Sequence, residues 1–176
     1  MALSPAKHVP QFFSADVCRA AGIDTNTLKN WLRADPSPIL MKQEDRLAVG
    51  SGRAHLFSFQ TAMQVALTAR LVALGLPPRR AGMVAAGFTD VSSGNGGWVG
   101  DTDPYDDLRL PCDLFKEGYT ILVAYVGDEI GHVINIEDST TALDLFHPYG
   151  RGRREVAAVV WVDFVYKHVR GVLYNE

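Results

Sequence analysis

The sequence predicts an α+β protein in which a mainly helical N-terminal half precedes a small antiparallel sheet and a C-terminal helix. Two observations support this fold class. Helix-capping residues and glycines at helix ends recur over residues 1–88, whereas the longer β-prone apolar runs come after residue 118. The chain has 176 residues, of which 47% are hydrophobic, and this is enough for one ordinary domain or two small ones.

Two short helices are predicted near the start of the chain. Ser14 is the expected N-cap of a helix over residues 15–21, and Gly22 is expected to end it. Asp24 is the expected N-cap of a second helix over residues 25–33. Two prolines follow closely and prevent this second helix from continuing.

A candidate hairpin and two longer helices complete the N-terminal half. Residues 46–57, RLAVGSGRAHLF, have β-prone flanks around Gly-Ser-Gly, which favours a β-hairpin and also fits a flexible loop. A third helix is expected to begin at Ser58 or Gln60 and to end near Gly75, and a fourth to run from a Pro-Pro pair to about Gly87. The third helix is apolar on nearly all sides, so we expect the protein's own core to cover it.

The C-terminal half is predicted to be a separate unit. Residues 89–118 are rich in glycine and aspartate, which indicates a long loop or linker. It would join a domain over residues 1–88 to a small α+β domain over residues 119–176. Strands are expected over residues 119–126 and 130–136, joined by a short turn.

A further strand and a helix are expected at the end of the chain. Residues 156–162 form a continuous apolar run, which is typical of a central strand. From Val162 onward the apolar residues recur at helical spacing and form one face. Trp161 and Phe164 lie inside this strand-to-helix run and are expected to belong to the core.

The second predicted helix has two chemically different faces. Leu28, Trp31 and Leu32 fall within one arc, which is suited to packing on neighbouring helices. The opposite arc carries side chains that hydrogen-bond base edges and phosphates: Asn26, Lys29, Asn30 and Arg33. Thr25, at the helix start, is suited to hold a phosphate through its hydroxyl and backbone N–H. A solvated helix face is the alternative interpretation.

Two capped helices joined at a glycine form the sequence pattern of a helix-turn-helix, and the candidate hairpin follows where a wing would lie. Residues 11–87 resemble the MerR-type winged helix-turn-helix family, through FFSADVCRAAGIDTNTLKNWLR and SGRAHLFSFQTAMQVALTARLVALGLPPRRAGMV. The positions that carry the resemblance are Gly22-Ile23, Leu28, Trp31, Gly52-Arg53, Phe57 and Gly75-Leu76. The resemblance implies that the second helix enters the major groove of DNA and that the wing contacts flanking backbone or minor groove.

The resemblance also assigns roles to individual residues. Recognition-helix contacts are Thr25, Asn26, Lys29, Asn30 and Arg33, wing contacts are Arg53 and His55, and weaker phosphate candidates are Lys42 and Arg46. The chain departs from the family in three respects. The segment before the wing tip is long and contains two prolines. A Gly-rich acidic loop stands where the family continues into a dimerisation helix. Metal sensing through cysteine clusters is not expected, because only Cys18 and Cys112 are present.

Charge and composition narrow the class of protein. The net charge is −3, but residues 1–90 hold 10 Lys and Arg against 6 Asp and Glu, whereas residues 91–176 hold 7 against 14. This asymmetry indicates two different tasks, and the acidic half is expected to face away from DNA. Because the sequence shows neither a membrane-spanning run nor a signal peptide, we expect a cytoplasmic protein whose two cysteines are reduced and buried.

Other chemical sites are weakly supported. Counted from Asp101, DTDPYDD places Tyr105, Asp106 and Cys112 at positions 5, 6 and 12 of a calcium loop, which does not match an EF-hand. The SSGNGGWVG stretch lacks the lysine of a phosphate-binding loop. His132 and His147 could pair with neighbouring carboxylates: Asp128, Glu129 or Asp144. Surface histidines are the simpler interpretation, and we expect no enzyme, cofactor or metal.

The function that the sequence favours is sequence-specific binding of double-stranded DNA by a transcriptional regulator acting as a homodimer. One alternative is an excisionase-like architectural protein of a mobile element, and another is an adaptor that keeps the helix-turn-helix only as a scaffold. For the C-terminal half, three roles stay open: dimerisation, sensing of a small ligand, or docking of a partner protein. The dimer interface is expected either in residues 60–74 or in the C-terminal sheet and helix.

Overall fold

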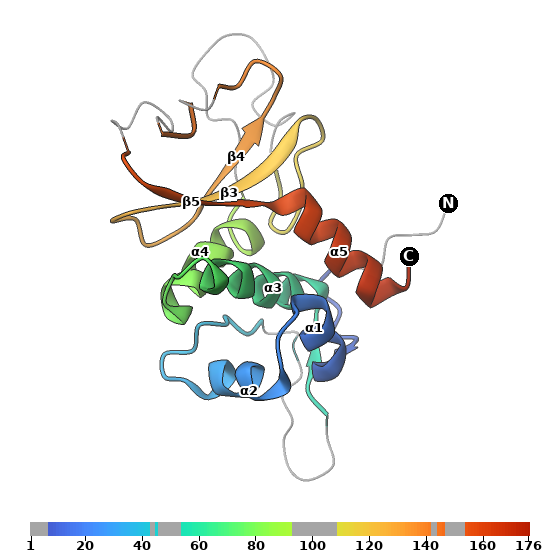
Figure 1. Ribbon diagram of the computed structural model, residues 1–176. Helices are drawn as coiled ribbons and strands as arrows, with labels where there is room; N and C mark the ends of the chain where they lie inside the picture. The colour runs from blue at the N-terminus through green and yellow to red at the C-terminus, as the bar shows by residue number, and fades with distance from the viewer. Residues whose placement is uncertain (1–6, 43–44, 46–53, 93–108, 142–143, 147–153) are drawn as a thin grey trace.

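The computed structural model describes residues 7–42, 45, 54–92, 109–141, 144–146 and 154–176, and it confirms the α+β class (Figure 1). These residues form five α-helices, one short 3-10 helix and two small antiparallel sheets. In chain order the elements are β1 (Phe12–Phe13), α1 (Ser14–Ala21), α2 (Thr25–Arg33), β2 (Leu56–Phe57), α3 (Phe59–Ala73), α4 (Pro78–Thr89), β3 (Tyr119–Tyr125), β4 (His132–Ile136), η1 (Asp144–Phe146), β5 (Ala157–Trp161) and α5 (Val162–Tyr174).

The predicted starts of α2 and α3 are confirmed, with Asp24 and Ser58 as their N-caps. The prediction for α1 was wrong by one residue, because Ser14 is already helical and Phe13 is the flanking residue. Phe13 is extended and pairs with Leu56 of β2, so the chain passes directly from strand to helix. The N–H of Phe13 donates to the carboxylate of Asp16 at 3.4 Å.

Helix α4 ends at Thr89, close to the predicted end near Gly87, so Gly87 itself lies within the helix. This glycine is buried inside the helix, where a Cβ atom would come within 2.9 Å of the carbonyl carbon of Gly131. Its function is therefore to let α4 approach the backbone between β3 and β4. A close approach of this kind needs glycine for lack of space, without requiring a helix end.

Helix α3 lies at the centre of the protein and is buried along most of its length. Helices α1, α4 and α5 pack against it, which confirms that the protein's own core covers this apolar segment (Figure 1). Across the described residues, no helix has both the length and the apolarity needed to cross a membrane. Because α3 is covered from several sides, it is a rigid support for the shorter helices around it.

The three-stranded sheet has the order β4-β3-β5, with antiparallel neighbours. The prediction that the run ending at Val162 is a central strand was wrong, because β3 is central and β5 lies at an edge. Trp161 and Phe164 were also expected in the core, yet they are 43% and 65% exposed. Apolar character alone could not reveal this, since strand order depends on pairing partners distant in the sequence.

One cluster of buried side chains runs through both halves of the chain, from Phe12 near the start to Val169 in α5. Residues 109–115, within the predicted linker, pack against the end of α4: Arg109 donates to the carbonyl oxygen of Phe88 at 3.0 Å, and Cys112 N–H donates to the same oxygen at 2.9 Å. Both cysteines are buried and not bonded to each other. The boundaries at residues 88 and 118 stay a prediction, but the core is shared across them.

The second arm of the candidate hairpin pairs with the start of the chain. In β2, Phe57 lies opposite Phe12 of β1, and Leu56 opposite Phe13. Residues 46–53, which would include the hairpin tip and a wing, lie outside the described residues. The structure therefore establishes the strand that leads into α3, and the wing itself stays a prediction.

Candidate nucleic-acid interface

The turn between α1 and α2 is built by local signals in the sequence. Gly22 adopts φ +71°, a left-handed conformation that favours glycine, and its N–H donates to the carbonyl oxygen of Cys18 at 2.9 Å. The N–H of Ile23 donates to the same oxygen at 3.1 Å. Asp24 then starts α2, accepting the N–H groups of Asn26 and Thr27 at 2.8 and 2.9 Å. This turn fixes the angle at which α2 leaves α1.

The apolar arc of α2 anchors the helix on the core, as predicted. Leu28 is 1% exposed and Trp31 is 8% exposed, while Leu32 is half-buried against the same cluster. The carbonyl oxygen of Trp31 accepts the hydroxyl of Ser37 at 2.9 Å, which ties the following chain to the end of the helix. Figure 1 shows α2 at the end of the molecule remote from the three-stranded sheet.

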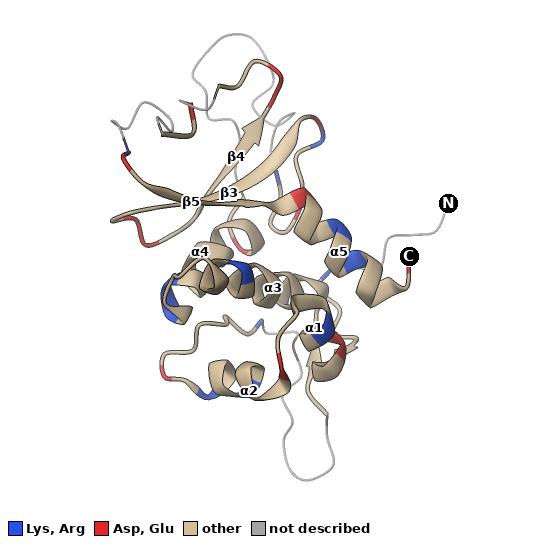
Figure 2. Cartoon of the chain, in the orientation of Figure 1, with Lys and Arg blue, Asp and Glu red and all other residues tan. Residues whose placement is uncertain are grey.

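The opposite face of α2 brings together the five residues expected to contact DNA. All five are exposed: Thr25, Asn26, Lys29, Asn30 and Arg33. Across the part of the chain that the structure describes, their side chains have no hydrogen bond or ion pair. Lys29 and Arg33 place two uncompensated positive charges on this face (Figure 2). The helix therefore presents free donors and acceptors to whatever approaches it.

The start of α2 is less suited to a phosphate than we expected. The carboxylate of Asp24 already accepts the N–H groups of Asn26 and Thr27, as well as the hydroxyl of Thr27 at 2.6 Å. These hydrogen bonds, first of all that of the Thr27 hydroxyl, lower the pKa of Asp24, so it is ionised at neutral pH. A phosphate here would meet this negative charge, which leaves the hydroxyl of Thr25 as its main contact.

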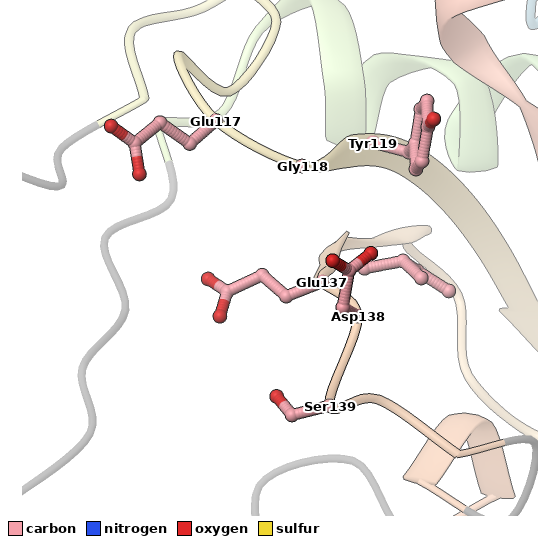
Figure 3. Close-up of a pocket in the computed structure, with 7 residues that line it drawn as sticks. Glu117, Gly118, Tyr119, Glu137, Asp138 and Ser139 are labelled. Atoms are coloured by element: carbon pink, nitrogen blue, oxygen red, sulfur yellow. The ribbon is translucent and has the colours of Figure 1, made fainter.

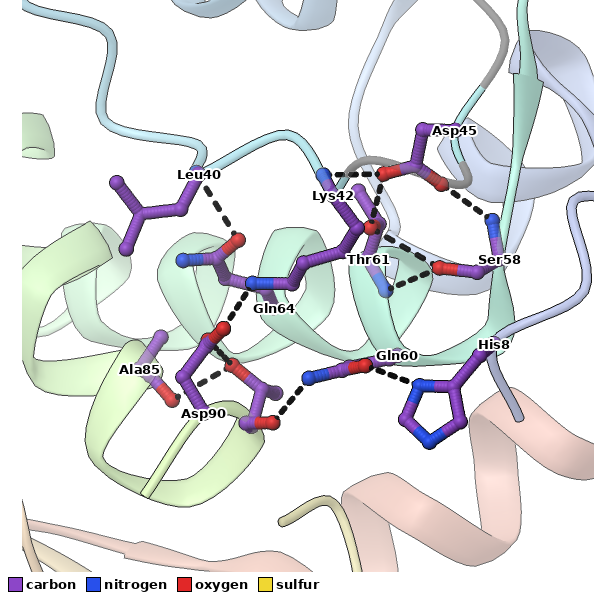
Figure 4. Close-up of polar contacts among 11 residues, drawn as sticks. His8, Leu40, Lys42, Asp45, Ser58, Gln60, Thr61, Gln64, Ala85 and Asp90 are labelled. Atoms are coloured by element: carbon purple, nitrogen blue, oxygen red, sulfur yellow. Dashed lines mark hydrogen bonds and ion pairs between the residues drawn. The ribbon is translucent and has the colours of Figure 1, made fainter.

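Lys42 lies apart from the face of α2. Its ammonium is paired with the carboxylate of Asp90, and its side chain is only 11% exposed (Figure 4). Its backbone N–H donates to Asp45, a buried carboxylate that also accepts the N–H of Ser58 at 2.7 Å and the hydroxyl of Thr61 at 2.5 Å. This network holds the start of α3 and the last described residue before the predicted wing.

The remaining predicted contacts are only partly described. Arg46 and Arg53 lie outside the described residues. His55 is half-buried and its ring stacks on Phe57, with centroids 6.0 Å apart. It stands just before β2, at the base of the candidate wing and not at its tip.

Arg70 is a candidate that the sequence did not single out. This exposed α3 residue lies over the turn between α1 and α2, with Nη1 3.7 Å from the position that a Cβ on Gly22 would take. No carboxylate pairs with it among the described residues. A single arginine near a helix end carries no sequence signal, and only the packing of α3 against α1 reveals its position.

Other polar groups are brought together in the sheet region. His132 Nε2 lies 2.8 Å from Asp128 Oδ2, and Arg154 Nη2 lies 3.0 Å from Asp128 Oδ1. Asp128 is the one of the three candidate carboxylates that pairs with His132, and His147 lies outside the described residues. Asp128 contacts both His132 and Arg154 and so ties the turn after β3 to the start of β5, while the buried Nε of Arg154 has no hydrogen-bond partner within the part of the chain that the structure describes. Among the described residues, no group of three His, Cys, Asp or Glu could hold a metal ion.

An acidic hollow of about 420 Å³ lies at one end of β3, next to Tyr119 (Figure 3). Its lining includes three carboxylates: Glu117, Glu137 and Asp138. Figure 3 shows the side chains of Glu117 and Glu137 extending to the same side, and the carboxylate of Glu137 accepts the side-chain N–H of Asn135 at 3.1 Å. The hollow belongs to the acidic half of the chain, remote from α2.

Comparison with known proteins places no constraint on the function, because the sequence matches no protein-family model and no curated protein.

Proposed function

We propose that this chain is a sequence-specific DNA-binding transcriptional regulator in which α1 and α2 act as a helix-turn-helix. The observation that carries this function is the free, exposed polar face of α2, on a helix whose other face is locked into the core by Leu28 and Trp31. Amphipathicity itself is ordinary for a surface helix, so the support comes from the residue types on the exposed face of this nine-residue helix, which are amide and basic side chains suited to base edges and phosphates. The resemblance to the MerR-type family points to the same function.

The spacing along α2 suits the reading of a few adjacent bases. From Asn26 to Arg33 the helix rises roughly 10 Å, which corresponds to about three base pairs. The amides of Asn26 and Asn30 suit adenine edges, and Lys29 and Arg33 suit guanine edges or phosphates. In this arrangement Arg53 and His55 of the proposed wing contact the flanking backbone, as does Arg70 above the turn.

One such helix reads too few bases for specificity, so the proposed protein acts in the cytoplasm as a homodimer on a two-fold symmetric site. The acidic half would lie away from the duplex, as the position of α2 at the opposite end of the molecule favours. Repulsion between that half and the phosphates would then favour one orientation on DNA over the reverse.

The test is a titration of wild type and of a Lys29→Ala/Arg33→Ala/Arg53→Ala variant with random and genome-selected duplexes at several salt concentrations. Wild type should select a discrete, roughly palindromic site, with affinity that falls steeply with salt. The variant should lose at least about a hundredfold, at roughly 1–3 kcal/mol for each good contact, and show a shallower salt slope. Lys116→Ala, an exposed lysine in the acidic half, is the matched control and should change neither.

Two other results would redirect the assignment. Equal, weak binding by wild type and the triple variant would refute DNA recognition by α2 and favour the adaptor, in which these helices serve only as scaffold. Strong bending of the selected duplex without an effect on transcription would favour the excisionase-like architectural protein over the regulator.

A further inference from the structure

Three exposed aromatic rings form a continuous chain where the sheet meets α5. Tyr119 of β3 packs edge-on against Trp161 of β5 with centroids 5.1 Å apart, and Trp161 packs edge-on against Phe164 of α5 at 4.8 Å. The three residues are 51%, 43% and 65% exposed. Large aromatic side chains left half in water are typical of interface centres and uncommon elsewhere on a surface. We name Tyr119, Trp161 and Phe164 the aromatic chain.

The two ends of the aromatic chain carry opposite charge. At the Tyr119 end lies the acidic hollow, with the free carboxylate of Glu117 two residues before the ring (Figure 3). At the Phe164 end lie Lys167 and His168, which follow Phe164 by three and four residues and therefore share its side of α5. Both are exposed, and neither has an ion-pair partner among the described residues.

We propose that the aromatic chain is the surface through which two copies of this protein bind each other, about a two-fold axis passing close to Trp161. Such an axis places the Tyr119 end of each copy on the Phe164 end of the other. The carboxylate of Glu117 then faces the ammonium of the partner's Lys167, and the same contact forms twice. A surface with opposite charges at its two ends is complementary to itself in this one arrangement.

The size of the surface is consistent with a dimer interface. The exposed parts of the three rings amount to roughly 250–400 Å². Val159, 40% exposed and on the same face of β5 as Trp161, adds to this apolar centre. A stable interface buries about 800 Å² on each partner, so the charged rim would supply the remainder. The other segment considered for dimerisation, α3, is buried within the monomer and cannot provide a second surface.

This interface rests on the proposed function in one respect, because DNA recognition by a homodimer requires a symmetric pair of α2 helices. The test of the interface itself does not involve DNA. Sedimentation of the full chain should show a dimer for wild type. Phe164→Ser, Lys167→Glu and Glu117→Lys should each weaken it at least about tenfold, as expected for interface-centre and paired charged residues. The double variant Lys167→Glu/Glu117→Lys should recover most of the affinity, because the exchanged charges meet again. Glu129→Lys, an exposed carboxylate in the turn after β3, should have no effect.

Two outcomes would overturn the dimer surface. A wild-type monomer at every concentration would assign the aromatic chain to a different protein, and a dimer insensitive to Phe164→Ser and to both charge reversals would place the interface elsewhere. Circular dichroism of each variant checks that the substitution leaves the fold intact. A monomer that still binds a single half-site refutes this interface alone, whereas a dimer that binds no DNA refutes the proposed function alone.

Discussion

Two glycine-to-alanine substitutions in helices should change stability in opposite directions. Gly82 lies in α4, where a Cβ would overlap the carbonyl oxygen of Pro38 and come within 2.7 Å of its carbonyl carbon. Gly171 lies in α5, where the nearest atom to a Cβ is a backbone oxygen at 3.5 Å, an ordinary contact. The two substitutions are chemically identical, so the difference between them isolates the close approach of α4 to the segment after α2.

The magnitudes follow from helix propensity and from the ability of the neighbours to move. Alanine stabilises a helix relative to glycine by about 0.5–1 kcal/mol, so Gly171→Ala should be more stable than wild type by that amount. At Gly82 the obstacle is backbone, held on one side by Ser37 bonded to Trp31 and on the other by Leu40 N–H bonded to Gln64 at 3.1 Å. Overpacking against an immobile neighbour costs about 1–3 kcal/mol or more, so Gly82→Ala should be destabilised by about 1–3 kcal/mol overall.

Thermal and urea unfolding of wild type and both variants measure these differences. At about 2–4 °C per kcal/mol for a chain of this size, Gly82→Ala should lower Tm by roughly 2–12 °C, and Gly171→Ala should raise it by roughly 1–4 °C. A Gly82→Ala protein as stable as wild type would refute the close packing of α4 on the Pro38 segment. It would also remove the support that this segment gives to the end of α2.

Four further predictions concern titratable and charged groups. Lys42→Ala should leave DNA affinity and its salt dependence unchanged, because the Lys42 ammonium pairs with Asp90, and the DNA titration checks this. Loss of the same pair should lower the free energy of unfolding by roughly 1 kcal/mol, which urea unfolding measures. The pKa of Asp24 in the folded protein lies below its unfolded value of 3.8. The stability that ionised Asp24 gives to α2 is therefore present above pH 3.8 and is lost as pH falls through the folded pKa. Hydrogen exchange of the α2 amides should become faster on acidification in wild type and change little in Asp24→Asn. Burial raises the pKa of Cys112 to about 12 from 9.0, so the stability that the neutral thiol contributes is complete below pH 9 and falls as pH rises towards 12. Unfolding of wild type and of Cys112→Ala, measured across that pH range, tests this dependence. At pH 8 a thiol reagent should label Cys112 and Cys18 only after unfolding, since both are buried and burial raises the pKa of each.

Elements whose signals are local could be predicted from the sequence to within a residue or two. Asp24 marks the start of α2 because its side chain accepts N–H groups two and three residues ahead, and Ser58 marks the start of α3 because its hydroxyl accepts the N–H three residues ahead. The division of α2 into a buried and an exposed face also follows from spacing alone, and Leu28 and Trp31 are buried as the spacing requires. These features depend on contacts within one or two helical turns.

Features that depend on distant partners could not be predicted. Gly87 has the sequence context of a helix end, but its function is set by Gly131 on the other side of the predicted linker. The sequence alone gives no ion-pair partner for Lys42, because Asp90 is distant in the chain and only the folded position of α4 places it beside the Lys42 ammonium. The apolar run of β5 indicates burial, whereas its place at the sheet edge leaves Trp161 half exposed.

The two proposed surfaces constrain each other through the position of the symmetry axis. In Figure 1, α2 and the junction of β5 with α5, to which Trp161 and Phe164 belong, lie on opposite sides of α3, on which α1 and α5 both pack. For both α2 helices of a dimer to reach the same side of one duplex, the two-fold axis must run from the aromatic chain towards the end that carries α2. An axis across that direction would point the two helices away from each other, onto separate duplexes. Half-sites on one face of DNA are spaced by about 34 Å or its multiples. The spacing between the half-sites of a selected palindrome therefore tests whether the two-fold axis at the aromatic chain has the direction that places both α2 helices on one duplex.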